Sequence, residues 1–493
     1  MDQKGTVGTG VLIEGGRIKR IVFDHEFVGS GHRHIDLEGA TLLPGFIDAH
    51  SHPLALGAAL SAIDCSPENV SSISELGKRL SCAAQSSDGW VRARGYDELL
   101  LAEKRHPTAA DLETAAPGRM IHLSHASGHG VVLSTLAMQA VGINKYTDPP
   151  PGGTIERDPA TGEPTGVLFE MDAWLRERLP RPSENDLNNY AKAASNDLLA
   201  KGITSVTDAG QENSAQKAEL YCKLSNAGLF RPRTTVMLSS TAEQRHFECG
   251  AKVRIGATKL VITFSGGDMH PSFDELAASI SEQNRTKRQV AIHAVELEAV
   301  IVACAVFSAV GGRPGNLELR HRIEHASECT PEVAMLIADA GLSVVTQLGF
   351  VQARGERYLS AWRDGAADPE DLYAVKNLID AGVHIGGSSD APFGPTAPLT
   401  AIQASVTRHG SNGSLVGAGQ AISTMQALNL YGPMGAWMDH QENAIGTIEP
   451  GKQADFVVLE NDPKKIIAEQ IGSIPVIATI IDGVPTYGSL PGY

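Results

Sequence analysis

The feature that most constrains the fold is an alternation of apolar, strand-like runs with helical patterns through the middle of the chain. Amphipathic segments such as SFDELAASISEQNRTK and TPEVAMLIADAG separate some of these runs. The runs are GITSVTDAG, ATKLVITF, RQVAIHAV, LELRHRIEHA, LSVVTQLGF and GVHIGGSSDA. Alternation of strands and helices over this length favours a parallel barrel over a β-sandwich. We therefore predict an α/β protein with a (β/α)8 TIM-type barrel.

The two ends of the chain have a different pattern. GVLIEGGRIKRIVFD predicts a hairpin that turns at residues 14–16, and ADFVVLEND and VIATIIDGVPTYG near the C-terminus also read as strands. We predict that residues 1–42 and 444–493 form a small β-sandwich domain, with the barrel of residues 43–443 inserted between them. Residues 54–200 are less regular, and DPPPGGTIERDPATGEPTG reads as turns. We expect this long insertion to lie over the barrel mouth.

Length, charge and cysteine pattern narrow the functional classes. A chain of 493 residues suits a large barrel with an accessory domain, and a net charge of −16 argues against a nucleic-acid or anionic-membrane surface. We expect a small-molecule substrate, no nucleic acid, no membrane, and a homodimer as the commonest assembly. The six cysteines are scattered without a CxxC pair, so we expect free thiols. Together with an N-terminus that lacks a signal-peptide pattern, they predict a cytoplasmic protein.

Candidate metal ligands lie where the predicted strands end. His50 and His52 follow the apolar run LLPGFIDA, and residues at i and i+2 of a strand point to the same face. Later predicted strands end near His293, His325 and Asp390. In a barrel the carboxyl ends of the strands form the catalytic mouth, and imidazoles and carboxylates bind divalent metals there. The order of these residues predicts a metal site at that rim.

Lys259 is a cation within the otherwise apolar run ATKLVITF. A buried lysine costs free energy unless its charge is paired or removed. Carbamylation by CO₂ would convert the amine into an anionic oxygen ligand able to bridge two metal ions. The alternative is that the side chain extends from the strand end to water.

The other candidates also have structural interpretations when each is taken alone. His50 and His52 are compatible with a surface loop, and His293 with a core histidine. His325 can pair with the neighbouring Glu324, and Asp390 can cap the following helix. Because all the candidates fall in order at predicted strand ends, we favour the metal site.

These residues resemble the metal-binding pattern of the amidohydrolase superfamily, and further motifs resemble its YtcJ-like branch, which contains N-substituted formamide deformylases. The similarity covers nearly the whole sequence and is carried by LLPGFIDAHSHP, RGYDE, HASGHGVVLSTLAM, GGTIERDPATGEPTGVLFE, GITSVTDAG, HRIEHA, GSSDAPFGPTAPL and GTIEPGKQADFVVLEND. The resemblance implies one or two divalent ions per chain, and zinc is the first choice because imidazole and carboxylate ligands suit it. It implies the ligands His50, His52, His293, His325 and Asp390, with Lys259 as a carbamylated bridge.

The resemblance implies a metal-dependent amidohydrolase that acts on an amide or related C–N bond of a small molecule through a metal-activated hydroxide. Asp390 would be the catalytic residue that accepts the proton of the attacking water and passes it to the leaving nitrogen. His129 and Glu170 match family positions and are predicted to bind substrate, and Tyr96 is a further candidate for the pocket lining. The alternative is that Glu170 starts a helix and His129 is a structural loop residue.

The sequence departs from the family pattern in two places. The segment that follows Lys259, within KLVITFSGGDMHPS, is longer than the corresponding segment of the family. The family pattern therefore does not predict the role of the loop around Met269. His293 is followed by Glu296, and this HxxE resembles the proton shuttle of mononuclear deaminases, which makes Glu296 a further substrate-site candidate. We favour its alternative, a carboxylate in the first turn of the next helix. A deaminase of an aminated ring and a non-catalytic scaffold with the same fold are the alternative functions.

Overall fold

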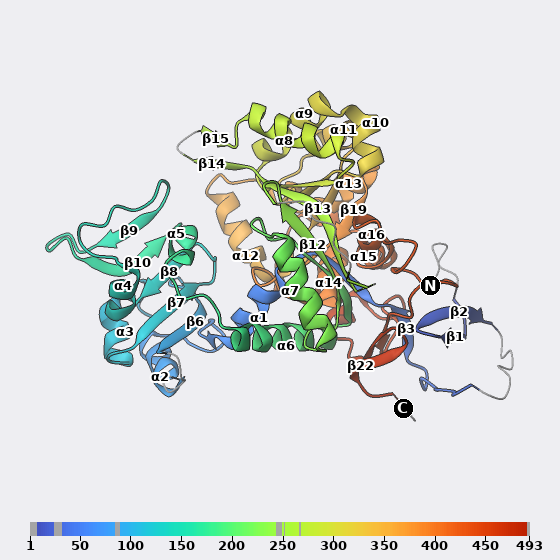
Figure 1. Cartoon of the computed structure of the whole chain (residues 1–493), viewed down its shortest axis with the longest axis horizontal. Coiled ribbons are helices and arrows are strands. Elements are labelled where there is room, and N and C mark those ends of the chain that lie inside the picture. The colour runs from blue at the N-terminus through green and yellow to red at the C-terminus, as the bar shows by residue number, and fades with distance from the viewer. Residues whose placement is uncertain are drawn as a thin grey trace. The chain divides into compact units, whose positions relative to one another are not determined.

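The computed structural model describes residues 7–23, 32–83, 89–242, 249–250, 252–265 and 268–490. The chain divides into two compact units (Figure 1). The first unit contains Met1–Pro53 and Ala194–Tyr493, and the second contains Leu54–Ala193.

An eight-stranded sheet forms the barrel of the first unit. Its strands follow one another in chain order and every neighbouring pair is parallel. The backbone N–H of Asp390 donates to the carbonyl of His50 at 2.9 Å and so links the first strand to the segment after the last. This confirms the predicted barrel. The strands are β4 Phe46–Ser51, β11 Ile203–Asp208, β12 Arg233–Ser239, β13 Val253–Val261, β16 Val290–Ala294, β17 Arg322–His325, β18 Ser343–Thr346 and β19 Ile385–Gly387.

The barrel strands are apolar because their side chains are covered on both faces. Every residue of β4, β11, β17 and β18 is buried, as expected for parallel strands with helical crossovers. The helices of this part of the chain are α6 Glu184–Ala200, which crosses the boundary between the units, α7 Ala215–Asn226, α8 Phe273–Arg285, α9 Leu297–Val310, α10 Gly312–Leu319, α11 Pro331–Ala340, α12 Gly349–Arg363, α13 Val375–Asp380, α14 Pro398–Thr407, α15 Thr424–Leu430 and α16 Pro433–Met438. A short hairpin, β14 Thr263–Ser265 with β15 Asp268–His270, follows β13.

Among the described residues, α9 and α10 come nearest to a membrane span. No single described helix is long and apolar enough to cross a bilayer. Taken together, α9 and α10 have the length and composition of a membrane span, but they are bent by 103° at their junction.

Two strand boundaries differ from the sequence prediction. In LELRHRIEHA the first three residues end α10 instead of beginning the strand, and in LSVVTQLGF the strand ends at Thr346. The strand β12, which has the sequence RTTVMLS, is not among the predicted strands.

The two ends of the chain contribute neighbouring sheets. β1 Gly10–Glu14 and β2 Arg17–Val22 form the predicted hairpin, and Gly15 and Gly16 adopt positive φ angles of 58° and 77° at its turn. An antiparallel sheet with the order β22-β21-β20-β3 combines β3 Thr41–Pro44 with β20 Phe456–Leu459, β21 Val476–Ile481 and β22 Val484–Gly488. Ile18 of the hairpin packs in one apolar cluster with Phe456 and Ile480 of this sheet. Their assignment to a separate domain stays a prediction.

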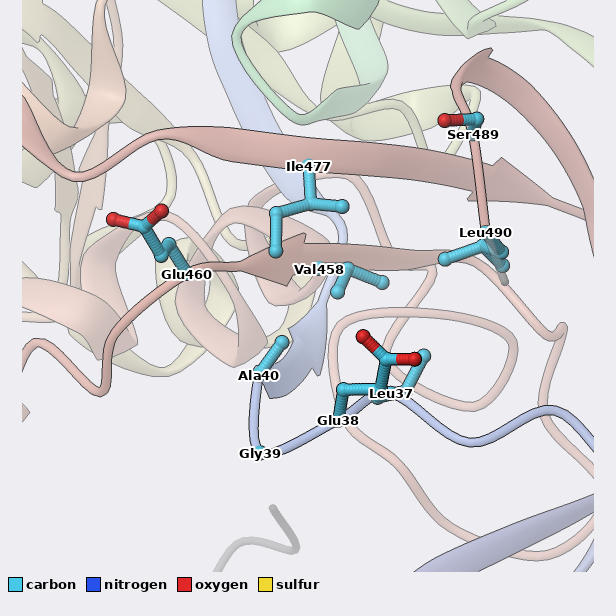
Figure 2. A pocket seen from close by; sticks show the side chains of 9 residues that line it. All are labelled: Leu37, Glu38, Gly39, Ala40, Val458, Glu460, Ile477, Ser489 and Leu490. Carbon is cyan, nitrogen blue, oxygen red and sulfur yellow. The ribbon is translucent and has the colours of Figure 1, made fainter.

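A pocket of about 460 Å³ lies against the antiparallel terminal sheet (Figure 2). Its lining combines apolar side chains with two carboxylates and contains none of the predicted site residues. The lining residues are Leu37, Glu38, Gly39, Ala40, Val458, Glu460, Ile477, Ser489 and Leu490.

The second unit has a sheet and apolar cores of its own, so the prediction of a less regular insertion is wrong. Its six strands have the order β5-β6-β7-β8-β10-β9. The segment DPPPGGTIERDPATGEPTG, which was predicted as turns, contains β9 and the start of β10. These two strands pair as an antiparallel hairpin. The elements are β5 Ile63–Asp64, β6 Trp90–Tyr96, β7 Met120–His125, β8 Gly130–Leu133, β9 Thr154–Arg157, β10 Pro164–Phe169, α1 Pro53–Ser61, α2 Ile73–Ala83, α3 Ala109–Ala115, α4 Thr135–Val141 and α5 Asp172–Arg176.

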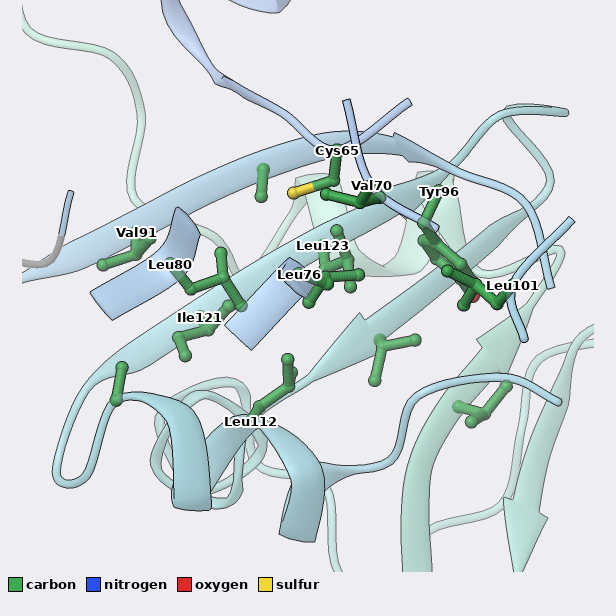
Figure 3. Close-up of a cluster of buried hydrophobic side chains, with 14 residues drawn as sticks. Cys65, Val70, Leu76, Leu80, Val91, Tyr96, Leu101, Leu112, Ile121 and Leu123 are labelled. Atoms are coloured by element: carbon green, nitrogen blue, oxygen red, sulfur yellow. The ribbon is translucent and has the colours of Figure 1, made fainter. Parts of the chain in front are cut away.

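Figure 3 shows one of these cores, in which side chains of α2 and α3 meet one face of the sheet. Leu76, Leu112 and Ile121 are fully buried there. The location of the second unit over the barrel mouth stays a prediction.

The structure corrects the cysteine prediction. Cys222 in α7 forms a disulfide with Cys249, while the other four cysteines are free thiols: Cys65, Cys82, Cys304 and Cys329. The two bonded residues are 27 positions apart, a spacing that carries no local sequence pattern.

Candidate functional site

The strand ends bring the predicted ligands to one end of the barrel. His50 lies on β4 with His52 just after it, and His293 and His325 lie at the carboxyl ends of β16 and β17. Asp390 follows β19. Because all eight strands are parallel, these positions share the rim at which a barrel presents polar side chains.

His50, His52 and Asp390 form a compact group. Their ligand atoms all lie within 4.8 Å of one another. The Nε2 atoms of His52 and His50 are 3.2 and 3.6 Å from Oδ1 of Asp390. Two ligands that each lie about 2.1 Å from a tetrahedral zinc ion are about 3.4 Å apart. The spacing of the three side chains therefore fits a divalent metal.

The backbone around Asp390 is tightly held. Asp390 has a φ of 54°, a left-handed conformation that residues other than glycine adopt where their surroundings fix it. The preceding Ser389 donates its N–H and its hydroxyl to the carboxylate of Asp48, at 3.0 and 2.5 Å. The alternative interpretation of Asp390 as a helix cap is wrong, because the next helix begins at Pro398.

His293 and His325 complete the cluster. Their ring centroids are 4.3 Å apart, and the ring of His325 is 4.8 Å from that of His50. Nδ1 of His325 lies 2.8 Å from the side-chain oxygen of Gln347, so Nδ1 carries the proton and Nε2 carries a lone pair.

The lone pair of His325 is the clearest indication that the cluster suits a metal ion. Its Nε2 is buried and has no hydrogen-bond partner in the described part of the chain. Leaving a buried acceptor unpaired costs about 1–3 kcal/mol. Coordination of a metal ion would satisfy this atom, so the residues present fit the predicted centre.

Lys259 is buried, with 4% of its surface exposed. The alternative interpretation, that its side chain reaches water, is therefore wrong. Burial lowers the pKa of its ammonium group to about 8, although the carboxylates of Glu324 and Asp390 act in the opposite direction. The lysine is thus a buried amine close to two carboxylates of the site.

Burial also lowers the pKa of the histidines in the cluster. The pKa of His293 falls to about 3, and those of His50 and His325 fall well below 6.5. The positive charge of Lys259 lowers all three further. These imidazoles are therefore neutral near pH 7, which is the form that binds a metal.

Glu324 bonds to His50 rather than to its chain neighbour. Its carboxylate contacts Nδ1 of His50, and the guanidinium of Arg322 donates to it at 2.6 Å. The alternative pairing of Glu324 with His325 is therefore wrong. Alternation along β17 could have indicated this, because Arg322 and Glu324 lie two apart and share a face. Sequence reasoning also missed the roles of Asp48, whose partner Ser389 is 341 positions away, and of Gln347, which is 22 positions from His325.

Glu296 lies at the N-cap of α9, where its side chain makes no capping hydrogen bond. This position agrees with the favoured interpretation of Glu296 as a carboxylate at a helix start. It is not one of the residues grouped as candidate ligands.

The remaining predicted substrate-binding residues lie in the second unit. Tyr96 is buried, and its hydroxyl is 3.0 Å from Nδ1 of His106. His129 and Glu170 form an exposed pair, with Nδ1 and Oε1 2.9 Å apart, and Glu170 lies two residues before α5. Their contact with substrate stays a prediction.

A second group of possible ligands lies in the second unit and consists of Asp97, Glu98 and His125. Nε2 of His125 is 2.6 Å from Glu98, and its Nδ1 is 2.7 Å from the hydroxyl of Ser127. Both ring nitrogens are thus satisfied by protein atoms, in contrast to His325, whose Nε2 has no partner in the described part of the chain. This group carries no comparable indication of a metal.

A model of the amidohydrolase family, Amidohydro_3, matches residues 33–487. The chain belongs to the amidohydrolase family. This confirms the resemblance that the sequence motifs indicated. Family membership and the cluster of candidate ligands together identify a metal-dependent hydrolase.

Two curated relatives belong to the expected branch. The chain is 28% identical to an N-substituted formamide deformylase of Arthrobacter pascens, over 99% of this chain and 96% of the relative. It is 27% identical to the putative amidohydrolase YtcJ of Bacillus subtilis, over 92% and 90%. Among solved structures, an uncharacterized metal-dependent hydrolase from Pyrococcus horikoshii has a TM-score of 0.75 at 21% identity, covering 94% of this chain and 95% of that one. This last likeness supports the fold.

Proposed function

We propose that this amidohydrolase hydrolyses an amide or a related C–N bond of a small molecule at the barrel rim. The observation that carries the proposal is the buried, unpartnered Nε2 of His325 beside the group formed by His50, His52 and Asp390. The name of the Arthrobacter relative makes N-substituted formamides the first substrates to test.

The donor set suits a divalent ion with imidazole and carboxylate ligands, and zinc is the first choice. His50, His52 and Asp390 would hold one ion, and His293 and His325 a second. A divalent ion, when bound, acidifies water and polarises a carbonyl oxygen.

Lys259 would join the two halves as a carbamate. The free lysine is a cation among buried histidines whose protonation it disfavours. Addition of CO₂ to its amine, with loss of a proton, would replace that cation with an anionic oxygen ligand. This change removes the cost of an incompletely compensated buried charge.

Asp390 would move the proton of the reaction. The carboxylate of Asp390 lies close to Nε2 of both His50 and His52, and its backbone is fixed. It can therefore accept a proton from the attacking water. It would then donate this proton to the leaving nitrogen. Protonation is required because an amide anion is a very poor leaving group.

The proposal is tested by screening the zinc-loaded protein against N-substituted formamides, N-acyl amino acids, carbamates and aminated rings. Release of an amine or an amino acid, lost on chelation and restored by zinc, is the expected result. Absence of turnover together with absence of stoichiometric metal would contradict the proposal and favour the non-catalytic scaffold.

The same screen separates amide hydrolysis from deamination. A mononuclear deaminase would release ammonia from an aminated ring, lose that activity in Glu296→Gln and tolerate Lys259→Ala. We expect the opposite pattern: Glu296→Gln keeps most activity, while Lys259→Ala loses metal and most activity.

A further inference from the structure

We infer that Glu324 is a positioning residue that makes the His50 half of the metal centre bind its ion more tightly than the His325 half. The inference rests on the proposed metal-dependent function. It concerns the partners of the ring nitrogens that face away from the metal.

Glu324 determines which nitrogen of His50 is free. Both side chains are fully buried, and the carboxylate of Glu324 contacts Nδ1. A carboxylate only accepts hydrogen bonds, so Nδ1 carries the proton and Nε2 keeps its lone pair. That Nε2 is the atom that lies 3.6 Å from Asp390. An anionic acceptor on the distal nitrogen also makes the metal-facing nitrogen more basic.

The carboxylate of Glu324 is itself held by a buried guanidinium. Nε of Arg322 donates to Oε1 at 2.6 Å, and Nη2 lies 3.4 Å from Oε2. The same guanidinium donates to Asp439 at 3.2 Å and to the carbonyl of Ala49 at 2.9 Å. Asp439 in turn accepts from the hydroxyl of Thr207 at 2.5 Å. The orientation of Glu324 is therefore fixed by protein contacts, before any ion binds.

His325 has a weaker partner at the equivalent atom. Its Nδ1 donates to the neutral amide oxygen of Gln347 at 2.8 Å, and the amide nitrogen donates to the hydroxyl of Ser388 at 3.0 Å. The amide fixes the same tautomer but carries no negative charge. His50 and His325 are thus both oriented by a hydrogen bond at Nδ1, and they differ in the charge of the group that accepts this bond.

The test compares Glu324→Gln with Asp439→Asn in the full-length protein. Both variants remove one carboxylate from the same guanidinium, but only the first changes the partner of His50. Zinc affinity is measured by competition with a chromophoric chelator, and the Co²⁺ absorption spectrum reports the ligand geometry. We expect Glu324→Gln to weaken the tightest ion about 10–100-fold and to alter the Co²⁺ bands, while Asp439→Asn, which leaves the contact between Glu324 and His50 in place, has a clearly smaller effect on both.

Equal affinity for the tightest ion in Glu324→Gln and wild type, or equal losses in the two variants, would overturn the inference. A second pair does not depend on the folding of Glu324→Gln: His325→Asn should retain the tightest ion, and His50→Asn should lose it. The reverse order would also overturn it. A wild-type protein that binds no zinc at this cluster would instead contradict the proposed function itself.

Discussion

At the residue scale, the site contains imidazoles from several strand ends, and protein groups hold Nδ1 of His50 and Nδ1 of His325. The sequence predicted the histidines and Asp390 because each follows an apolar run. It did not predict Asp48 and Gln347, because their roles depend on contacts with Ser389 and His325. Ligand types have a sequence signature, whereas the groups that orient them are defined by the closed barrel.

The first residue-scale prediction concerns Asp390. Asp390→Asn should lower kcat/KM on the best substrate of the screen by about 10²–10⁴-fold, because the amide cannot accept the proton of the attacking water. Steady-state kinetics of the metal-loaded protein provide the measurement. Asp380→Asn, which alters an exposed carboxylate paired with Lys376, is the control and should remain near wild type. Comparable activity in the two variants would remove Asp390 from the mechanism.

The second residue-scale prediction concerns pH. The pKa of His293 is about 3 in the folded, metal-free protein and 6.5 as the ordinary value. Below pH 6.5 the unfolded chain therefore binds a proton at His293 that the folded chain excludes. The contribution of this group to the free energy of unfolding is complete above pH 6.5 and is lost as the pH falls toward 3.

Urea unfolding of the metal-free protein at pH 7.5 and pH 5 measures this effect. The free energy of unfolding should be lower at pH 5, and His293→Asn should reduce the difference between the two values. An unchanged difference in His293→Asn would contradict the assigned burial of this imidazole.

At the element scale, the sequence predicted most barrel strands because short apolar runs that alternate with helical patterns are typical of buried parallel strands. It missed β12, which begins with Arg233. That arginine is buried through a paired contact with Asp455, 222 residues later, and neither partner alone indicates burial. The turn-like composition of residues 148–166 likewise concealed the β9–β10 hairpin.

Helix capping gives the element-scale prediction. Ser272 begins α8 with a complete capping box, in which Ser272 and Glu275 bond each other's backbone N–H. Ser272→Ala should lower the free energy of unfolding by about 1 kcal/mol. Ser214 begins α7 without a side-chain capping bond, so Ser214→Ala is a matched control with a smaller expected effect. Urea unfolding measures both, and equal losses would contradict the assigned cap.

At the scale of the whole molecule, the chain brings its two ends together beside the barrel. β3 of the terminal sheet leads through Gly45 directly into β4. The backbone passes so close to Thr204 that a Cβ at Gly45 would lie 2.2 Å from its hydroxyl, so glycine is required there. The N–H of Gly45 donates to the carbonyl of Asp455 at 3.0 Å. The composition of the ends predicted strands, but only the folded chain shows which of them meet.

The Arg233–Asp455 pair gives the prediction at this scale. Its hydrogen bonds of 2.6 and 3.1 Å connect β12 of the barrel to the residue that precedes β20, and both side chains are buried. Asp455→Ala should cost about 3 kcal/mol, because it removes the main partner of a buried cation. Glu14→Ala, which disrupts an exposed pair with Lys19, should cost less than about 1 kcal/mol. Thermal or urea unfolding distinguishes them, and equal costs would contradict this role for the pair.

The most direct measurement is an anomalous-diffraction map of the zinc-loaded protein recorded at the zinc edge. The expected result is a peak within about 2.0–2.2 Å of Nε2 of His50, Nε2 of His52 and a carboxylate oxygen of Asp390. A map in which zinc binds elsewhere, or in which these three side chains contact no ion at saturating zinc, would contradict it.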